Sequence, residues 1–130
     1  MTWRGSTQHA FLEIVEPTMN ERLKRPIRQV IEHLVAGEYG ELATLTMGHR
    51  LTAQEMARAL RDYGRTLAVP PDDAFDLMDV VEVRDAQPRQ WSVTMPLWTR
   101  EEGRSDLSIV VTLIADAGHF RIELDDIHVL

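Results

Sequence analysis

The densest cluster of side chains able to do chemistry is the stretch TREEGRSD, residues 99–106. Its carboxylates come from Glu101, Glu102 and Asp106. Several carboxylate oxygens on a short segment are the ligands that a divalent cation requires. However, Arg100 and Arg104 lie among them, and the alternating Asp/Asn pattern of a calcium loop is absent. We therefore predict no metal or cofactor, and an ordered turn held by arginine–carboxylate pairs, with a recognition loop as the alternative.

Two further features of the second half of the chain are candidates for partner binding. Trp98 adjoins the turn, and tryptophan is enriched at interface hot spots, although packing against Val110 is the favoured alternative. Acidic residues also flank the expected strands. They are expected to be solvated connectors, with a charged patch for a basic protein as the alternative. These residues are Asp72, Asp73, Asp76, Asp79, Asp125 and Asp126.

The motifs of common enzyme classes are missing from the sequence. None of the five histidines forms an HExxH or HxH pattern, so a zinc site is not expected. Phosphate-binding glycine loops and the GxSxG nucleophile motif do not occur, and the chain has no cysteine. Asp62 and Tyr63, beside Arg65, could serve acid–base chemistry, but a structural role at a helix end is favoured. We therefore predict a protein that is not an enzyme.

Charge is distributed unevenly along the 130 residues, whose formal net charge is −7. Residues 1–65 hold nine Lys/Arg and eight Asp/Glu, whereas residues 66–130 hold five Lys/Arg and thirteen Asp/Glu. An acidic half repels phosphate backbones, so we do not expect nucleic-acid binding. It attracts a basic protein, with solubility as the alternative role of the charge. No apolar run is long enough for a membrane span, and the N-terminus does not read as a signal peptide, so a cytoplasmic location is expected.

Hydrophobic periodicity predicts helices in the first half of the chain. A weak apolar stripe covers residues 1–17, and a clear one runs from Pro26, as first helical residue, to Ala36, with a further helical turn before it, over residues 20–25, as an alternative. A short segment follows over residues 39–45, with Gly48 as its end. The clearest helix starts at the capping box formed by Thr52 and Glu55 and stops at Gly64.

The second half of the chain reads as four strands joined by tight turns. The strands are expected over residues 77–84, 91–99, 107–115 and 119–130. The third is apolar on both faces, which indicates a central strand. Pro96 implies a bulge or an edge, Asp125-Asp126 a bulge, and Asp116-Ala-Gly118 a three-residue hairpin loop.

This order of elements predicts a single α+β domain over residues 1–130, with a helical half at 1–69 and a sheet half at 72–130. The helices are expected to pack on a curved four-stranded antiparallel meander, in two layers with a cone-like shape. The other face of the sheet would then meet solvent, a ligand or a partner.

Several phrases of the sequence resemble a small bacterial family of unknown function, some members of which occur near polymorphic-toxin loci. The phrases are LVAGEYGEL, RLTAQEMARALRDYG, PP, LWTREEGRSDL and DDIHVL, and the resemblance covers residues 26–130. The first phrase and the meander are also similar to the cystatin-like, nuclear-transport-factor-like cone superfamily. That likeness implies a cone fold and a range of roles that includes toxin immunity, while the Asp/His pocket pair of cone enzymes has no clear counterpart here.

The favoured hypothesis is a non-catalytic protein-binding module, of the immunity type, that neutralises a basic toxin domain through an acidic surface. The surface expected to bind comprises Asp72, Asp73, Asp76, Trp98, Arg100, Glu101, Glu102, Arg104, Asp106, Asp125 and Asp126. One alternative is a small-molecule binder or enzyme with a pocket between helices and sheet, near Asp62, Tyr63, Trp91 and His119. Another is a structural homodimer that pairs through its exposed sheet face.

Overall fold

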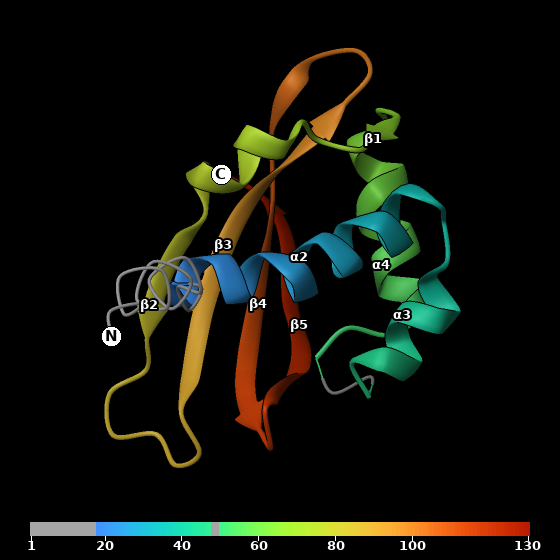
Figure 1. The fold of residues 1–130 in the computed structure, drawn as a ribbon. Helices are drawn as coiled ribbons and strands as arrows, with labels where there is room; N and C mark the ends of the chain where they lie inside the picture. Colours follow the sequence, from blue (N-terminus) through green and yellow to red (C-terminus); the bar gives the residue numbers. More distant parts are fainter. Residues whose placement is uncertain (1–17, 48–49) are drawn as a thin grey trace, which may run out of the picture.

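The chain folds as helices followed by an open antiparallel sheet, which confirms the α+β class (Figure 1). The computed structural model describes residues 18–47 and 50–130. Its helices are α2 (Met19–Val35), α3 (Tyr39–Leu45), α4 (Ala53–Tyr63) and the 3-10 helix η1 (Asp72–Leu77). Its strands are β1 (Leu67–Ala68), β2 (Asp79–Glu82), β3 (Gln90–Thr99), β4 (Gly103–Asp116) and β5 (His119–Val129). The order in the sheet is β1-β3-β4-β5, and β2 pairs with another part of β3.

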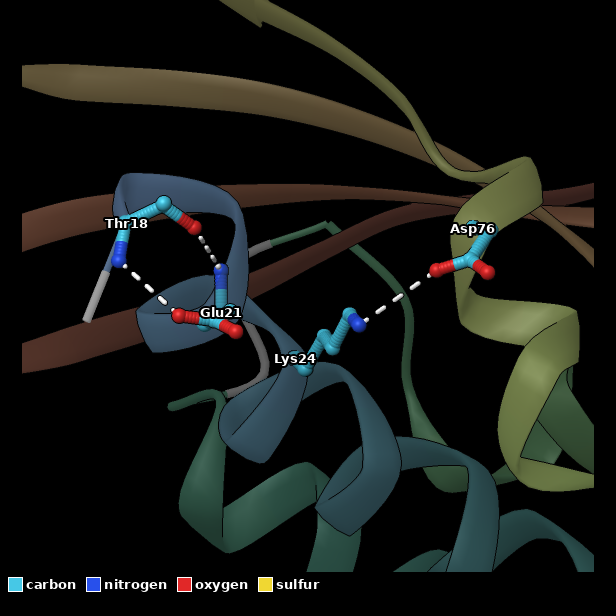
Figure 2. A network of polar contacts seen from close by, with 4 residues as sticks. All are labelled: Thr18, Glu21, Lys24 and Asp76. Atoms are coloured by element: carbon cyan, nitrogen blue, oxygen red, sulfur yellow. Dashed lines mark hydrogen bonds and ion pairs between the residues drawn. The ribbon is translucent and has the colours of Figure 1, made fainter.

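Helix α2 begins earlier than the sequence suggests, so the expectation that Pro26 is its first residue was wrong. Thr18 Oγ1 accepts a hydrogen bond from Glu21 N at 3.2 Å, and the Glu21 carboxylate accepts one from Thr18 N at 3.0 Å (Figure 2). This capping box satisfies free donors at the helix start. Pro26 lies inside the helix and is buried. Burial of the ring compensates for the backbone donor that proline lacks.

Helices α3 and α4 lie where the sequence predicts them. The Thr52–Glu55 capping box starts α4, and Gly64 ends it with a left-handed φ of 75°. A residue with a side chain is strained at this φ, which explains the glycine. The helix expected in residues 1–17 and the stop expected at Gly48 lie outside the described residues.

One face of the sheet packs against the helices, and α2 crosses this face (Figure 1). Val93 pairs with Val111 and Met95 with Ile109, so these side chains share the inner face, and all are fully buried. They pack with the apolar stripe of α2, which is formed by Leu23, Ile27, Val30, Ile31 and Leu34. Alternation places a second set on the opposite side, which we call the outer face. Its central residues, which are half-buried, are Ser92, Thr94, Val110, Thr112 and Glu123.

The boundary between the two halves of the chain is less simple than expected. The two-residue strand β1 lies in the expected helical half, and helix η1 occupies the start of the expected sheet half. The first long strand therefore starts at Asp79 instead of Leu77. Pro70-Pro71 does separate α4 from η1, but Phe75 is 1% exposed and anchors η1 in the core. Burial of one aromatic ring thus favours a helical turn over an extended strand.

Both expected irregularities of the sheet are present. Three residues of β4, Ser105–Leu107, face Leu97 of β3, just after Pro96. The buried Ser105 hydroxyl donates to the carbonyl of Leu97 at 2.8 Å, so it supplies a hydrogen bond that the regular ladder would make. In β5, Val110 pairs with Asp126 and Val111 with Leu124, which leaves Asp125 as the bulged residue. β4 lies between β3 and β5, which confirms it as a central strand.

The β4–β5 hairpin turn is tighter than predicted. Asp116 pairs with His119, so only Ala117 and Gly118 lie between the strands, and the three-residue loop was wrong. Both turn residues have positive φ, 49° and 88°. This is the pattern of a type I′ turn, whose twist matches that of the strands but which costs an alanine about 1–2 kcal/mol.

Replacement of Ala117 by asparagine should therefore stabilise the fold. Asparagine tolerates the left-handed region and, unlike glycine, does not add much freedom to the unfolded chain. We expect Ala117→Asn to raise the free energy of unfolding by about 1 kcal/mol, measured by urea denaturation. Ala36→Asn is the matched control, because Ala36 is exposed with a φ of −79°. Equal effects of the two substitutions would contradict strain at Ala117.

Candidate functional site

The tip of the β3–β4 hairpin is tied to the segment that follows α4. Glu101 accepts hydrogen bonds from Thr66 N at 2.8 Å and from Thr66 Oγ1 at 3.0 Å. Glu102 accepts from the Tyr63 hydroxyl at 2.8 Å and from Thr99 Oγ1 at 3.0 Å. We call these bonds the tip tether; those from Tyr63 and Thr66 join residues that are far apart in the sequence, whereas the Thr99 bond is local. The two carboxylates therefore hold the hairpin in place.

The tip tether shifts the titration of its members. The pKa of Glu101 lies below its ordinary value, first because the Thr66 backbone N–H donates to the carboxylate, with a smaller contribution from the Arg65 charge. The pKa of Tyr63 lies above its ordinary value because partial burial and the Glu102 carboxylate both disfavour a phenolate. The phenol of Tyr63 therefore stays a donor, and the Glu101 carboxylate stays an acceptor, at neutral pH.

The expected arginine–carboxylate pairs within this turn were wrong. Among the described residues, Arg100 and Arg104 make no ion pair, and both are exposed. The Arg100 backbone N–H instead donates to Thr66 O at 2.8 Å. Backbone and hydroxyl donors from the α4–β1 connection occupy the carboxylates because an exposed ion pair gains little in water. No group of three potential metal-ligating side chains occurs within residues 18–47 and 50–130.

The acidic residues of η1 face α2. Asp76 lies 3.4 Å from the Lys24 ammonium group (Figure 2), and Asp72 lies 3.3 Å from the Arg28 guanidinium group. The Arg28 guanidinium group also stacks over the Phe75 ring at 4.5 Å. Asp73 is exposed. Part of the charge that was expected to meet a partner is thus balanced by the basic side of α2.

The bulge of β5 holds the third acidic group. Asp125, with a side chain only 17% exposed, accepts a hydrogen bond from Thr112 Oγ1 at 2.6 Å, and Arg50 lies 3.7 Å away. Asp126 accepts from Ile127 N at 2.9 Å and lies 3.0 Å from His128 Nδ1. The expected binding residues therefore fall into three separate sets of contacts, at η1, at the hairpin tip and at the bulge.

Ser108, His128 and Asp126 have the residue types of a nucleophile, a base and an orienting acid. Ser108 pairs with His128 across the two strands, on the outer face. However, Ser108 is 0% exposed and its hydroxyl has no hydrogen-bond partner among the described residues. A nucleophile must reach a substrate and contact its base, so this arrangement does not form a catalytic triad.

Trp98 is half-buried and packs against the hydrophobic core. It alternates with Leu97, which is buried in the core, and pairs with Ala68 of β1 and Arg104 of β4. The packing against Val110 that the sequence favoured for this residue stays a prediction. The bulge beside Trp98 makes its exact environment hard to predict from strand alternation.

The residues of the alternative internal pocket do not come together around a cavity. Trp91 is 3% exposed and belongs to the core, Tyr63 donates to Glu102, and Asp62 is exposed. His119 instead lines an open groove of about 420 Å³ between α2 and the β4–β5 turn. Sequence patterns did not indicate this groove, because α2 and the turn are far apart in the chain. The two arginines near the start of the helix, Arg22 and Arg25, were the signal that was available.

The phenol of Tyr63 should contribute to stability through Glu102. We expect Tyr63→Phe to lower the urea midpoint, and Glu102→Ala to cost less in the Tyr63→Phe background than in the wild type. A double-mutant cycle measures this coupling. The control is Tyr39→Phe, because the Tyr39 hydroxyl has no side-chain hydrogen bond among the described residues. Additive effects of the two tether substitutions would show that the contact contributes nothing.

Acid should weaken the tip tether at Glu101. A carboxylate whose pKa is lowered by folding adds stability above its ordinary pKa of about 4.3, and this stability is lost as the pH falls through the lowered value. The pKa of Glu101 is lowered in this way by Thr66. We therefore expect Glu101→Gln to lower the free energy of unfolding by its full amount at neutral pH and by less in acid. Urea titrations of the variant and the wild type at a series of pH values measure this difference. A difference that does not change with pH would contradict this role.

Of the comparisons with known proteins, the one with family models finds a match. No curated protein and no solved structure is significantly similar to the chain. Within the described residues, no helix is long and apolar enough to cross a membrane. Residues 31–130 match the model of one family, the domain of unknown function DUF7668. This match covers α3, α4, η1, all five strands and the last part of α2, and the chain therefore belongs to the DUF7668 family.

Proposed function

We propose that this protein is a non-catalytic protein-binding module that docks a basic partner on the outer face of its sheet. The observation that carries the proposal is the asymmetry of the sheet, since the central residues of one face are buried under the helices while those of the other stay half-exposed. An extended face of this kind, on which neither groove of the described residues lies, suits a protein better than a small substrate.

The chemistry of the outer face matches a basic protein. Hydroxyls and a valine lie at its centre, in Thr94, Val110 and Thr112. Val81 of β2, which is 57% exposed, extends the apolar part. The charged residues that border this centre are Asp79, Glu123, Asp125, Asp126 and Arg121. Arg50 lies 3.7 Å from Asp125 and balances its charge, so three carboxylates remain beside the Arg121 guanidinium group. This excess of negative charge favours a partner with a positive surface and increases its rate of association.

A toxin domain is the class of partner that we propose, and the protein would then act as an immunity protein. The support is the acidic outer face and the resemblance of the sequence phrases to proteins found near toxin loci. This docking surface is narrower than the one expected from the sequence. It keeps Asp125 and Asp126, which border the outer face, and leaves out Asp72, Asp76, Glu101 and Glu102, whose exposed contacts lie at η1 and at the hairpin tip.

The homodimer expected from the sequence, which pairs through the exposed sheet face, stays a prediction, whereas pairing of two copies edge to edge is discouraged by the edge strand. β5, the long edge strand, carries a bulge at Asp125 and alternating charged side chains such as Arg121 and Glu123. Bulges and charges on an edge strand discourage pairing between copies. Light scattering on the purified protein distinguishes a dimer from a monomer.

The docking proposal is tested with the product of the adjacent gene as the partner, by isothermal titration calorimetry. We expect Thr94→Arg to weaken binding by tenfold or more, because it places bulk and positive charge at the centre of the outer face. The matched control is Thr44→Arg on the exposed side of α3, which changes the net charge equally. Affinity should also fall as salt is added.

Equal weakening by the two substitutions would refute the outer face as the docking surface. Absence of any binding between the two proteins would remove the support for an immunity role. Binding that does not depend on salt would contradict a basic partner.

A further inference from the structure

The groove between α2 and the β4–β5 turn has a cationic lining on an acidic chain. Its polar lining comes from Arg22, Arg25, Gln29 and His119, together with Glu21. Its apolar lining comes from Pro26, Phe120 and Ile122. A volume of about 420 Å³ lies within the range of small-molecule sites, which is roughly 300–1,000 Å³.

Positive charge dominates the lining. Arg22 and Arg25 make no ion pair among the described residues. The Glu21 carboxylate accepts from the Thr18 backbone N–H and so is engaged at the helix cap. His119 lies 3.8 Å from Asp116, which becomes an ion pair only when the imidazole is protonated. Two arginines against one engaged glutamate give the lining a positive formal charge, on a protein whose net charge is −7.

The fold also orients part of this lining in advance. The Arg22 guanidinium group stacks over the Phe120 ring, 5.7 Å from its centroid. Phe120 in turn makes an edge-on contact with Trp91 of the core, with ring centroids 5.7 Å apart. A side chain that is held in place loses little entropy when it binds, and a guanidinium group presents a planar set of donors to a carboxylate or phosphate.

We propose that this groove binds a small organic anion. Its carboxylate or phosphate lies between Arg22 and Arg25, with Gln29 and His119 as further hydrogen-bonding groups. Its apolar part lies on Pro26, Phe120 and Ile122. The site does not depend on the proposed docking function, because Ile122 pairs with Leu113 on the inner, helix-covered side of the sheet.

The proposal is tested on the full chain by titrations followed in amide NMR spectra, with three probes. Adenosine monophosphate and benzoate each join an anionic group to a flat ring, one through a phosphate and one through a carboxylate. Inorganic phosphate has the charge without the apolar part. We expect saturable shifts at the amides of residues 22–29 and 118–122 with at least one organic probe at millimolar concentration, and weaker binding of phosphate.

The variant Arg25→Gln should weaken binding of that probe about tenfold, because it removes a charge-assisted hydrogen bond. Arg25 is exposed on α2, and Arg58→Gln on α4 is the matched control, since it removes an equal charge from another exposed helix surface. The relative affinities of adenosine monophosphate and benzoate then show whether phosphate or carboxylate is the preferred group.

Three results would overturn the proposal. They are the absence of saturable shifts with both organic probes, phosphate binding as tight as that of the organic anions, and equal weakening by Arg25→Gln and Arg58→Gln. None of these results bears on the outer face, whose test uses a protein partner.

Discussion

Burial of the inner face of the sheet under α2 is the constraint on which the rest of the structure depends. Apolar side chains of α2, such as Ile27 and Ile31, pack with those of β3 and β4, such as Val93 and Ile109. Each buried side chain of this kind contributes roughly 1.5–3 kcal/mol relative to exposure. Because this layer is filled, the candidate binding sites lie outside it, on the outer face and in the groove at the end of α2.

The carboxylates show how the fold assigns roles to similar side chains. At the hairpin tip, backbone and hydroxyl donors of the α4–β1 connection hold Glu101 and Glu102. At η1, basic side chains of α2 balance Asp72 and Asp76. Exposed ion pairs and exposed hydrogen bonds differ little in free energy, so the nearest donor in the folded chain decides the partner. The charge left for recognition is mainly that of the outer face.

Opposite charges on opposite sides of one sheet separate the two proposed sites. The outer face combines Asp79, Glu123 and Asp126 with a centre of hydroxyls, which suits a basic protein surface. The groove on the helix side combines Arg22 and Arg25 with apolar residues, which suits a small anion. The helices pack on one face of the sheet only. The two sides of the sheet therefore present different side chains, which suit two unlike ligands.

Local patterns in the sequence were sufficient for the elements whose causes are local. The capping box at Thr52, the left-handed stop at Gly64, the bulges near Pro96 and at Asp125, and the central position of β4 follow from neighbouring residues or from alternation. The start of α2 was missed because weight was placed on Pro26, although the Thr18–Glu21 capping box was there to be read. The α+β class follows from the order of these elements.

Only the tertiary structure decided which distant residues meet. Tyr63 and Thr66 reach Glu102 and Glu101, Lys24 and Arg28 reach the acidic residues of η1, and α2 meets the β4–β5 turn at the groove. Each of these contacts depends on the angle at which a helix crosses the sheet. That angle is set by the packing of the whole core, which no short stretch of sequence encodes.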